Sequence, residues 1–319
     1  MTRYDAFNGD ADGICALHQL RLAEPGESVL VTGVKREIDL VRRIEAGSGD
    51  EVTVLDVSFD KNRDDVARLL EAGATVRYFD HHYPGEIPGH PHLEAHIDTS
   101  PETCTSLLVD DYLQGMYRPW AIVAAFGDNL EQVARRVAEG MEMDDDQIEA
   151  LRHLGIYLNY NGYGVDLEDL FFAPDELYRR MQPYEDPFAF IAEEPAFEEL
   201  RSGYDDDMAK AEAVEPQIEE KRCALYVLPE APWARRVGGV FGNALAQQAP
   251  GPAHALPPAL PGGGHRGGVP PPPAPRPGAA GPRRPLPHSH PAHAAPGINL
   301  LPADQFDTFV ERFRQTFSG

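Results

Sequence analysis

Two aspartates near the N-terminus have the spacing of a metal-binding turn. Residues 8–13 read NGDADG, so Asp10 and Asp12 follow a strand-like segment and have glycines on either side. Glycine permits the tight backbone that would turn both carboxylates toward one cavity, and Mn²⁺ or Mg²⁺ prefers carboxylate oxygens. A simple acidic turn is the alternative. A calcium loop of the EF-hand type is disfavoured, because Arg21 stands where that loop needs a glutamate.

Three further motifs follow apolar runs and carry the same kinds of side chain. They are Asp56 after residues 52–55, Asp80-His81-His82 after residues 75–79, and Asp128 after the apolar stretch 121–125. Neutral imidazole is a good ligand for transition metals. Taken singly, each motif has an ordinary alternative, which is a helix cap, a solvated loop or a turn. Their shared position after apolar elements favours one common site.

Strand-like and helical runs alternate through the part of the chain that carries these motifs. The sequence predicts strands at 4–7, 29–32, 52–55 and 75–79, and helices at 13–22, 38–45, 63–72, 130–141 and 147–158. This rhythm is typical of an α/β domain with a mostly parallel sheet. Such sheets carry their sites at the carboxyl ends of the strands, and three of the four motifs lie there.

The chain is long enough for two domains. Residues 1–200 are predicted to form the α/β domain and a helical connector, followed by a charged linker or exposed helix at about 200–222. Residues 223–319 are predicted to form a smaller α/β domain, with an apolar run at 223–228 and helices at 237–247 and 304–317. The last helix carries a row of phenylalanines on one face. We expect little of the chain to cover that row.

Residues 249–296 differ in kind from the rest of the chain. They hold 16 of its 30 prolines and 5 of its 12 histidines, and they contain no Asp, Glu, Lys or aromatic residue. Such a segment cannot bury a core or form a sheet ladder. It is either a natural disordered linker or a stretch translated in the wrong reading frame. The sharp compositional boundaries on both sides favour the second explanation.

The bulk composition limits the classes of partner. The formal charge of −24, from 52 acidic and 28 basic residues, repels phosphate backbones and argues against a grip on long duplexes. Acidic surfaces also suit a cytoplasm with high salt. No apolar run reaches the roughly 18 residues that span a membrane, and no secretory signal is evident. Three scattered cysteines fit a reducing cytoplasm, where we expect the protein to be.

In their order and spacing, the four motifs resemble those of the DHH phosphoesterase superfamily. That superfamily includes RecJ-type exonucleases, nano-RNA and cyclic-dinucleotide phosphodiesterases, exopolyphosphatases and family II pyrophosphatases. The resemblance covers about the first 130 residues. The region from about 223 onward resembles the DHH-associated C-terminal domain in fragments. A glycine-rich, basic loop is expected there shortly before residue 297, where residues 288–296 show no glycine run.

The resemblance implies two divalent ions, Mn²⁺ in the first place or Mg²⁺, that polarise a phosphoryl group and activate water. Their implied ligands are Asp56 between the ions, Asp10 on the first, and Asp12, His81 and Asp128 on the second. Asp80 would be a further ligand or would accept a hydrogen bond that fixes a histidine. His82 would face the substrate phosphate and, with Asp56, act in catalysis.

Three further residues are candidates for substrate contact. Asn8 stands where relatives often have His or Asp, and it offers a carbonyl oxygen without charge. Thr105 and Ser106 precede a helical run, where hydroxyls or amides can bind phosphate, although an ordinary helix cap explains them equally well.

The predicted function is metal-dependent hydrolysis of phosphoester or phosphodiester bonds in short oligonucleotides or small phosphorylated nucleotides. One alternative is a single-strand exonuclease of the RecJ type. Another is a non-catalytic nucleotide-binding protein that keeps the fold. We expect no membrane partner, and a homodimer is compatible with this prediction.

Overall fold

The computed structural model describes residues 1–220, 223–248, 253–255, 265–268, 297–301 and 303–317. The chain divides into two compact units, Met1–Ser202 and Gly203–Gly319. Most of the proline-rich stretch 249–296, together with the reading-frame hypothesis that concerns it, lies outside the described residues. Within the described part of the chain, no helix combines the length and the apolar character needed to cross a membrane.

The first unit is built on a five-stranded sheet in which every pair of neighbours is parallel. In spatial order the strands are β2 (Val29–Val31), β1 (Arg3–Phe7), β3 (Glu51–Leu55), β4 (Thr75–Asp80) and β5 (Leu93–Ile97). The predicted α/β class with a mostly parallel sheet is confirmed. β5 was not predicted, because polar Glu94 and His96 interrupt this edge strand.

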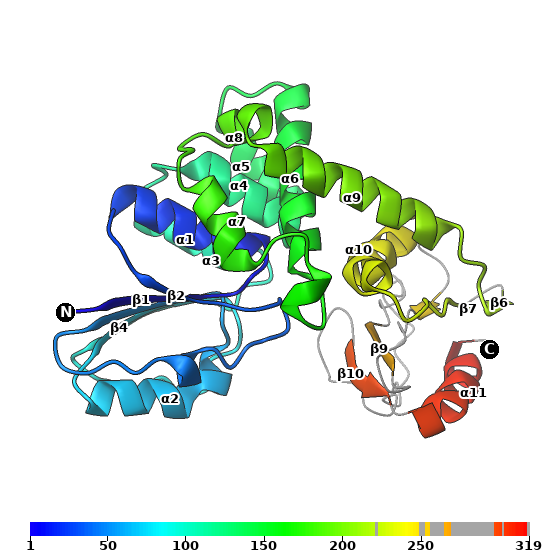
Figure 1. Ribbon diagram of the computed structural model, residues 1–319, viewed down its shortest axis with the longest axis horizontal. Helices are drawn as coiled ribbons and strands as arrows, with labels where there is room; N and C mark the ends of the chain where they lie inside the picture. Colours follow the sequence, from blue (N-terminus) through cyan, green and yellow to red (C-terminus); the bar gives the residue numbers. More distant parts are fainter. Residues whose placement is uncertain (221–222, 249–252, 256–264, 269–296, 302, 318–319) are drawn as a thin grey trace, which may run out of the picture. The chain divides into compact units, whose positions relative to one another are not determined.

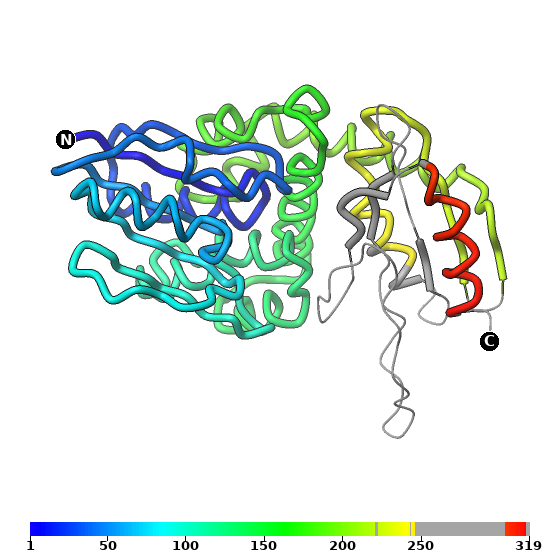
Figure 2. Tube along the Cα trace, turned by 90° about the horizontal axis from the view of Figure 1, so that it is seen from below, coloured from blue at the N-terminus to red at the C-terminus, as the bar shows by residue number. Residues whose placement is uncertain are grey.

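Helices cover both faces of this sheet (Figure 1). The helical elements of the first unit are α1 (Ala11–Ala23), η1 (Val41–Arg43), α2 (Phe59–Glu71), α3 (Thr105–Tyr112), α4 (Arg118–Gly127), α5 (Glu131–Ala138), α6 (Asp145–Gly162), η2 (Leu167–Asp169), α7 (Pro174–Met181), α8 (Pro187–Glu193) and the start of α9 (Pro195–Glu212). α2 covers one face, and α1 lies on the other with α3 and α4 packed against it (Figures 1 and 2). α9 occupies much of the stretch predicted as a linker or exposed helix.

Burial explains why these elements pack in this way. Val52 and Val54 alternate along β3 and share one core with Val66 and Leu69 of α2, which are three residues apart on that helix. Each such buried side chain stabilises the fold by about 1.5–3 kcal/mol relative to an exposed one. α1 is buried along most of its length because it contacts β1 as well as α3 and α4.

The helix predicted at 38–45 is wrong, because only the single 3₁₀ turn η1 forms there. Its apolar residues Val41 and Ile44 are buried at a helix-like spacing. Their backbone carbonyls, however, accept hydrogen bonds from the Arg68 side chain of α2, at 3.4 and 3.1 Å. The Ile44 amide still donates to the Val41 carbonyl at 3.1 Å, so the Arg68 side chain takes the place of a helical hydrogen bond only at the Ile44 carbonyl.

In its described residues, the second unit contains the end of α9, two small sheets and two further α-helices. Its elements after α9 are β6 (Ile218–Glu220), β7 (Cys223–Leu225), α10 (Pro232–Gln248), β8 (Ala253–Ala255), β9 (His265–Gly268), β10 (Gly297–Leu301), η3 (Ala303–Gln305) and α11 (Phe306–Phe317). One sheet has the order β6-β7-β8, and β9 pairs antiparallel with β10. β8 and β9 lie within residues 249–296, so the expectation that this stretch forms no sheet ladder is wrong for these two short segments, neither of which contains proline.

The apolar face of α11 is covered, contrary to expectation. Phe309 and Phe313 are fully buried against Cys223 and Leu225 of β7, and Figure 2 shows α11 beside that strand. For the part of this face that the structure describes, the predicted exposed row of phenylalanines is therefore wrong, because β7 supplies the apolar partner. Arg314 of the same helix pairs with Glu220 of β6 at 2.6 Å.

Candidate metal centre

The acidic motifs meet at the carboxyl edge of the first sheet. The last residues of β1, β3 and β4 lie side by side, since Phe7 pairs with Leu55 and Leu55 pairs with Phe79. In a sheet of the order 2-1-3-4-5, helices leave in opposite directions after β1 and β3, which opens a crevice outside these strand ends. Asp10 follows β1 and Asp56 follows β3 at this point.

Asp56 leaves β3 in a backbone conformation that few side chains adopt. Its φ is 58°, in the left-handed region, and its amide donates to the carbonyl of Phe79 at 3.0 Å. Non-glycine residues in this region are uncommon, Asp and Asn are the most tolerant of it, and such positions cluster at functional sites. The carboxylate is buried, and its Oδ1 accepts a hydrogen bond from Thr105 Oγ1 at 3.3 Å.

The start of α3 holds Asp12 in place. The amides of Thr105 and Ser106 donate to its two carboxylate oxygens at 2.8 and 2.7 Å, and Ser106 Oγ donates to its carbonyl. Thr105 and Ser106 are fully buried. The substrate contacts predicted for Thr105 and Ser106 do not fit this arrangement. Their hydrogen bonds instead orient Asp12 and Asp56.

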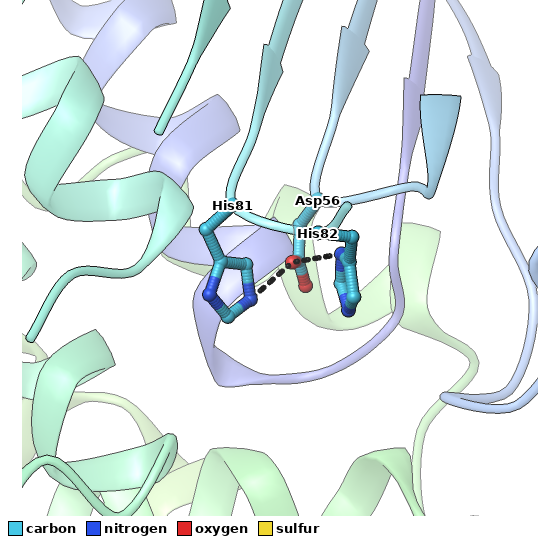
Figure 3. A group of neighbouring side chains, drawn as sticks. All are labelled: Asp56, His81 and His82. Atoms are coloured by element: carbon cyan, nitrogen blue, oxygen red, sulfur yellow. Dashed lines mark ion pairs between the residues drawn. The ribbon is translucent and has the colours of Figure 1, made fainter. Parts of the chain in front are cut away.

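His81 stands among three carboxylates. Its Nε2 lies 3.4 Å from Asp56 Oδ1 and 3.9 Å from an oxygen of each of Asp12 and Asp128. Two groups in the described residues have the ligand types and spacing for a metal ion: Asp12–His81–Asp128 and Asp56–His81–His82. Figure 3 shows the second group, with both imidazoles beside the Asp56 carboxylate. His81 belongs to both groups, and its Nε2 is the atom that lies near the carboxylates of Asp12, Asp56 and Asp128.

The concentration of negative charge perturbs these groups strongly. Burial and the neighbouring charges of Asp10 and Asp12 raise the pKa of Asp56 well above its usual range. Burial, opposed by Lys35, raises the pKa of Asp128 to about 6. Burial alone would lower the pKa of His81, but its hydrogen bond and attraction to Asp56 raise it to about 10. Buried carboxylates arranged in this way require a compensating positive charge, which a divalent ion supplies.

Asp80 orients His82. Its buried carboxylate accepts from the amide of Phe59 through Oδ2 at 3.1 Å, and its Oδ1 lies 2.7 Å from His82 Nδ1. Asp80 belongs to neither metal-spaced group in the described residues, which favours the hydrogen-bond acceptor over the ligand among the two predicted roles. His82 is 45% exposed, and its Nε2 is the nitrogen left for another partner.

Lys35 is a charged residue of the site that the sequence analysis did not identify. Its Nζ lies 2.6 Å from Asp10 Oδ2 and 3.8 Å from Asp128 Oδ1. Burial disfavours both charges, yet their mutual attraction lowers the pKa of Asp10 and raises that of Lys35 well above its usual value. Its position shortly after β2, at the same sheet edge, was the available signal. Lysine is not a usual metal ligand, so a pattern of acids and histidines at strand ends does not include it.

Asp10 and Asn8 take other partners in this arrangement. Asp10 Oδ1 caps α1 by accepting from the amides of Asp12 and Gly13, each at 3.1 Å. Neither metal-spaced group in the described residues includes Asp10. Asn8 is buried, its Nδ2 donates to the carbonyl of Lys35 at 3.2 Å, and its Oδ1 has no hydrogen-bond partner.

No protein-family model matches the chain, and no curated protein matches it. Solved structures do match. The crystal structure of exonuclease RecJ bound to manganese is 15% identical, with a TM-score of 0.61 over 98% of this chain and 89% of the other. RecJ of Thermus thermophilus with Mn²⁺ gives 15% identity and a TM-score of 0.59 over 98% of this chain and 51% of that one. The pGpG-specific phosphodiesterase PggH of Vibrio cholerae gives 12% identity and a TM-score of 0.57 over 99% of both chains.

These similarities establish the fold. They agree with the resemblance that the four motifs carry, since RecJ and PggH are both DHH-type proteins. The chain has the fold of the DHH phosphoesterases.

Proposed function

We propose that this chain is a metal-dependent hydrolase of phosphoester or phosphodiester bonds in short oligonucleotides or small phosphorylated nucleotides. The observation that carries the proposal is the set of Asp12, His81 and Asp128, with Asp56 beside them, at the carboxyl edge of a DHH-type fold. Two structural neighbours are an exonuclease bound to manganese and a phosphodiesterase specific for pGpG.

The donor atoms fit a divalent cation. Carboxylate oxygens suit Mg²⁺ and Mn²⁺, and the imidazole of His81 favours the transition metal. When bound, such an ion polarises the phosphoryl group and makes water a stronger nucleophile near neutral pH. The prediction of two ions requires Asp10 to bind one of them, whereas the present proposal requires only the ion held by Asp12, His81 and Asp128.

The remaining residues of the site orient its ligands and stabilise the negative charge that develops on the substrate. The start of α3 orients Asp12 through two backbone amides, and the buried Asp80 carboxylate orients the His82 ring. With Nδ1–H donated to Asp80, a doubly protonated His82 has Nε2–H left to donate to a phosphoryl oxygen as negative charge develops there. These groups are in place before substrate arrives, which limits the cost of reorganisation during the reaction.

The charge of the chain bears on the class of substrate. With a net charge of −24, the protein attracts long polyanions poorly, so the proposal favours short substrates. A dinucleotide such as pGpG, a short single-stranded oligonucleotide and a long single strand should be compared as substrates. Preference for the long strand would support the exonuclease alternative. Binding of the dinucleotide without turnover in Mn²⁺ would support the non-catalytic alternative.

The variant Asp56→Asn tests the proposal. Asparagine tolerates the left-handed backbone at this position, so the substitution removes charge with little strain. We expect it to abolish hydrolysis of the dinucleotide and to lower bound Mn²⁺ more than Asn8→Ala does. Asp64→Ala, on the exposed side of α2, is the matched control and should change neither. Full activity in Asp56→Asn would contradict the proposal.

A further inference from the structure

The backbone of Lys35 is held from two sides. Its amide donates to the carbonyl of Gly162, the last residue of α6, at 2.9 Å. Its carbonyl accepts from Asn8 Nδ2 at 3.2 Å. α6 and the end of β1 therefore fix the point from which the Lys35 side chain extends into the centre.

The ammonium group of Lys35 is surrounded by oxygen atoms. Besides Asp10 Oδ2 at 2.6 Å, it donates to Asn159 Oδ1 at 3.0 Å, and Asp128 Oδ1 lies 3.8 Å away. The ring of Tyr163 lies beneath it, with its centroid at 5.4 Å. Two carboxylates, an amide oxygen and an aromatic face together make a site for a positive charge.

An ion bound to Asp10 would have to compete with this arrangement. One Asp10 oxygen already caps α1, and the other pairs with Lys35. The nearby Asn8 contributes no charge. A divalent ion at Asp10 would also meet the Lys35 ammonium at close range, where like charges repel strongly because water is excluded.

We propose that Lys35 is a built-in cation that takes the place of one of the two divalent ions predicted from the sequence. The centre then takes one exchangeable ion, held by Asp12, His81 and Asp128. The inference rests on the proposed function only in requiring that this remaining site bind a divalent ion.

The stoichiometry of Mn²⁺ tests the proposal directly. Equilibrium dialysis followed by elemental analysis counts the ions per chain, and electron paramagnetic resonance distinguishes an isolated Mn²⁺ from an exchange-coupled pair. We expect the wild-type protein to bind one uncoupled ion. Lys35→Arg keeps the positive charge and should also bind one.

Two further variants distinguish the effect of the Lys35 charge on the number of bound ions from the effect of the missing carboxylate at position 8. Asn8→Asp adds a carboxylate but keeps Lys35, and it should still bind one ion. Asn8→Asp combined with Lys35→Met frees Asp10 Oδ2 and removes the repelling charge, so it should bind two coupled ions. Circular dichroism and thermal melting show whether each variant is folded.

The results separate this inference from the proposed function. A coupled pair of Mn²⁺ ions in the wild-type protein would overturn the inference. This result needs no folded variant, and it does not depend on whether the protein hydrolyses a dinucleotide. A folded double variant that still takes one ion would overturn it as well. One uncoupled ion in a wild-type protein that hydrolyses no phosphodiester would support the inference and contradict the proposed function.

Discussion

Binding of Mn²⁺ to the metal-free protein should release at least one proton at pH 7. His81 has a pKa of about 10 in the metal-free centre, so at pH 7 it carries a proton that a metal ligand cannot keep. Because pH 7 lies about three units below this pKa, removing the proton costs about 4 kcal/mol of binding free energy, at about 1.36 kcal/mol per unit. His81 shares the proton with Asp56, and the number released does not depend on which of them holds it.

The sign of the pH dependence follows from these shifts. A raised pKa keeps the ligand protonated to higher pH, so protons compete with the metal and its affinity falls as the pH falls. Between pH 7 and 9 the Mn²⁺ association constant should rise at least about tenfold per pH unit because of the His81–Asp56 pair. The pKa of Asp128 is about 6, so below that pH this carboxyl adds a further proton to the competition.

Calorimetry in buffers of small and large protonation enthalpy measures the protons released. We expect the heat of Mn²⁺ binding at pH 7.5 to depend on the buffer by at least one protonation enthalpy. Asp64→Ala, on the exposed side of α2, is the control and should release as many protons as the wild-type protein at both pH 5.5 and pH 7.5. A heat that is independent of the buffer at pH 7.5 would refute the electrostatic account of the centre.

Three further predictions concern other parts of the molecule. His81→Ala should lose bound Mn²⁺, whereas His82→Ala should keep it and lose about 10²–10³ in turnover; equal metal loss in both would refute the division of roles. Gly155→Ala should destabilise the fold by about 1–3 kcal/mol in denaturant unfolding, because its Cβ would lie 2.2 Å from the Val123 carbonyl, while Gly89→Ala, with open space, should be near neutral. Limited proteolysis should cut first within residues 249–296, and reading the coding DNA there with compensating frame shifts should restore an acidic segment with glycines just before residue 297. Protease resistance of this stretch, or the lack of such a frame, would favour the linker explanation.

Much of the first unit could be predicted because its signals are local. Apolar runs of strand length, each followed by Asp or His, indicate parallel strands that end at one edge, and the sheet order brings Asp56 and His81 together there. The order of strands itself did not need to be known, since all parallel strands of one sheet share their carboxyl edge.

The partners of the polar groups near that edge follow from the packing of the fold and could not be predicted from the sequence. Thr105 and Ser106 begin a helix with free amides, and it is the packing of α3 against α1 that directs those amides to Asp12. The spacing of residues 38–45 suits a helix, but hydrogen bonds from Arg68 support a different backbone.

The same limit applies to the charge of the centre. The residues that are able to bind a divalent ion can be predicted from the chain alone, because that ability belongs to the side-chain types and to their place after strands. The sequence did not determine how many ions the centre needs. In the proposal above, that number depends on Lys35. This residue reaches Asp10 because it follows β2, which pairs with β1, and because its amide bonds to the end of α6. Electrostatic balance is set by distances in space, and residues far apart in the chain decide it.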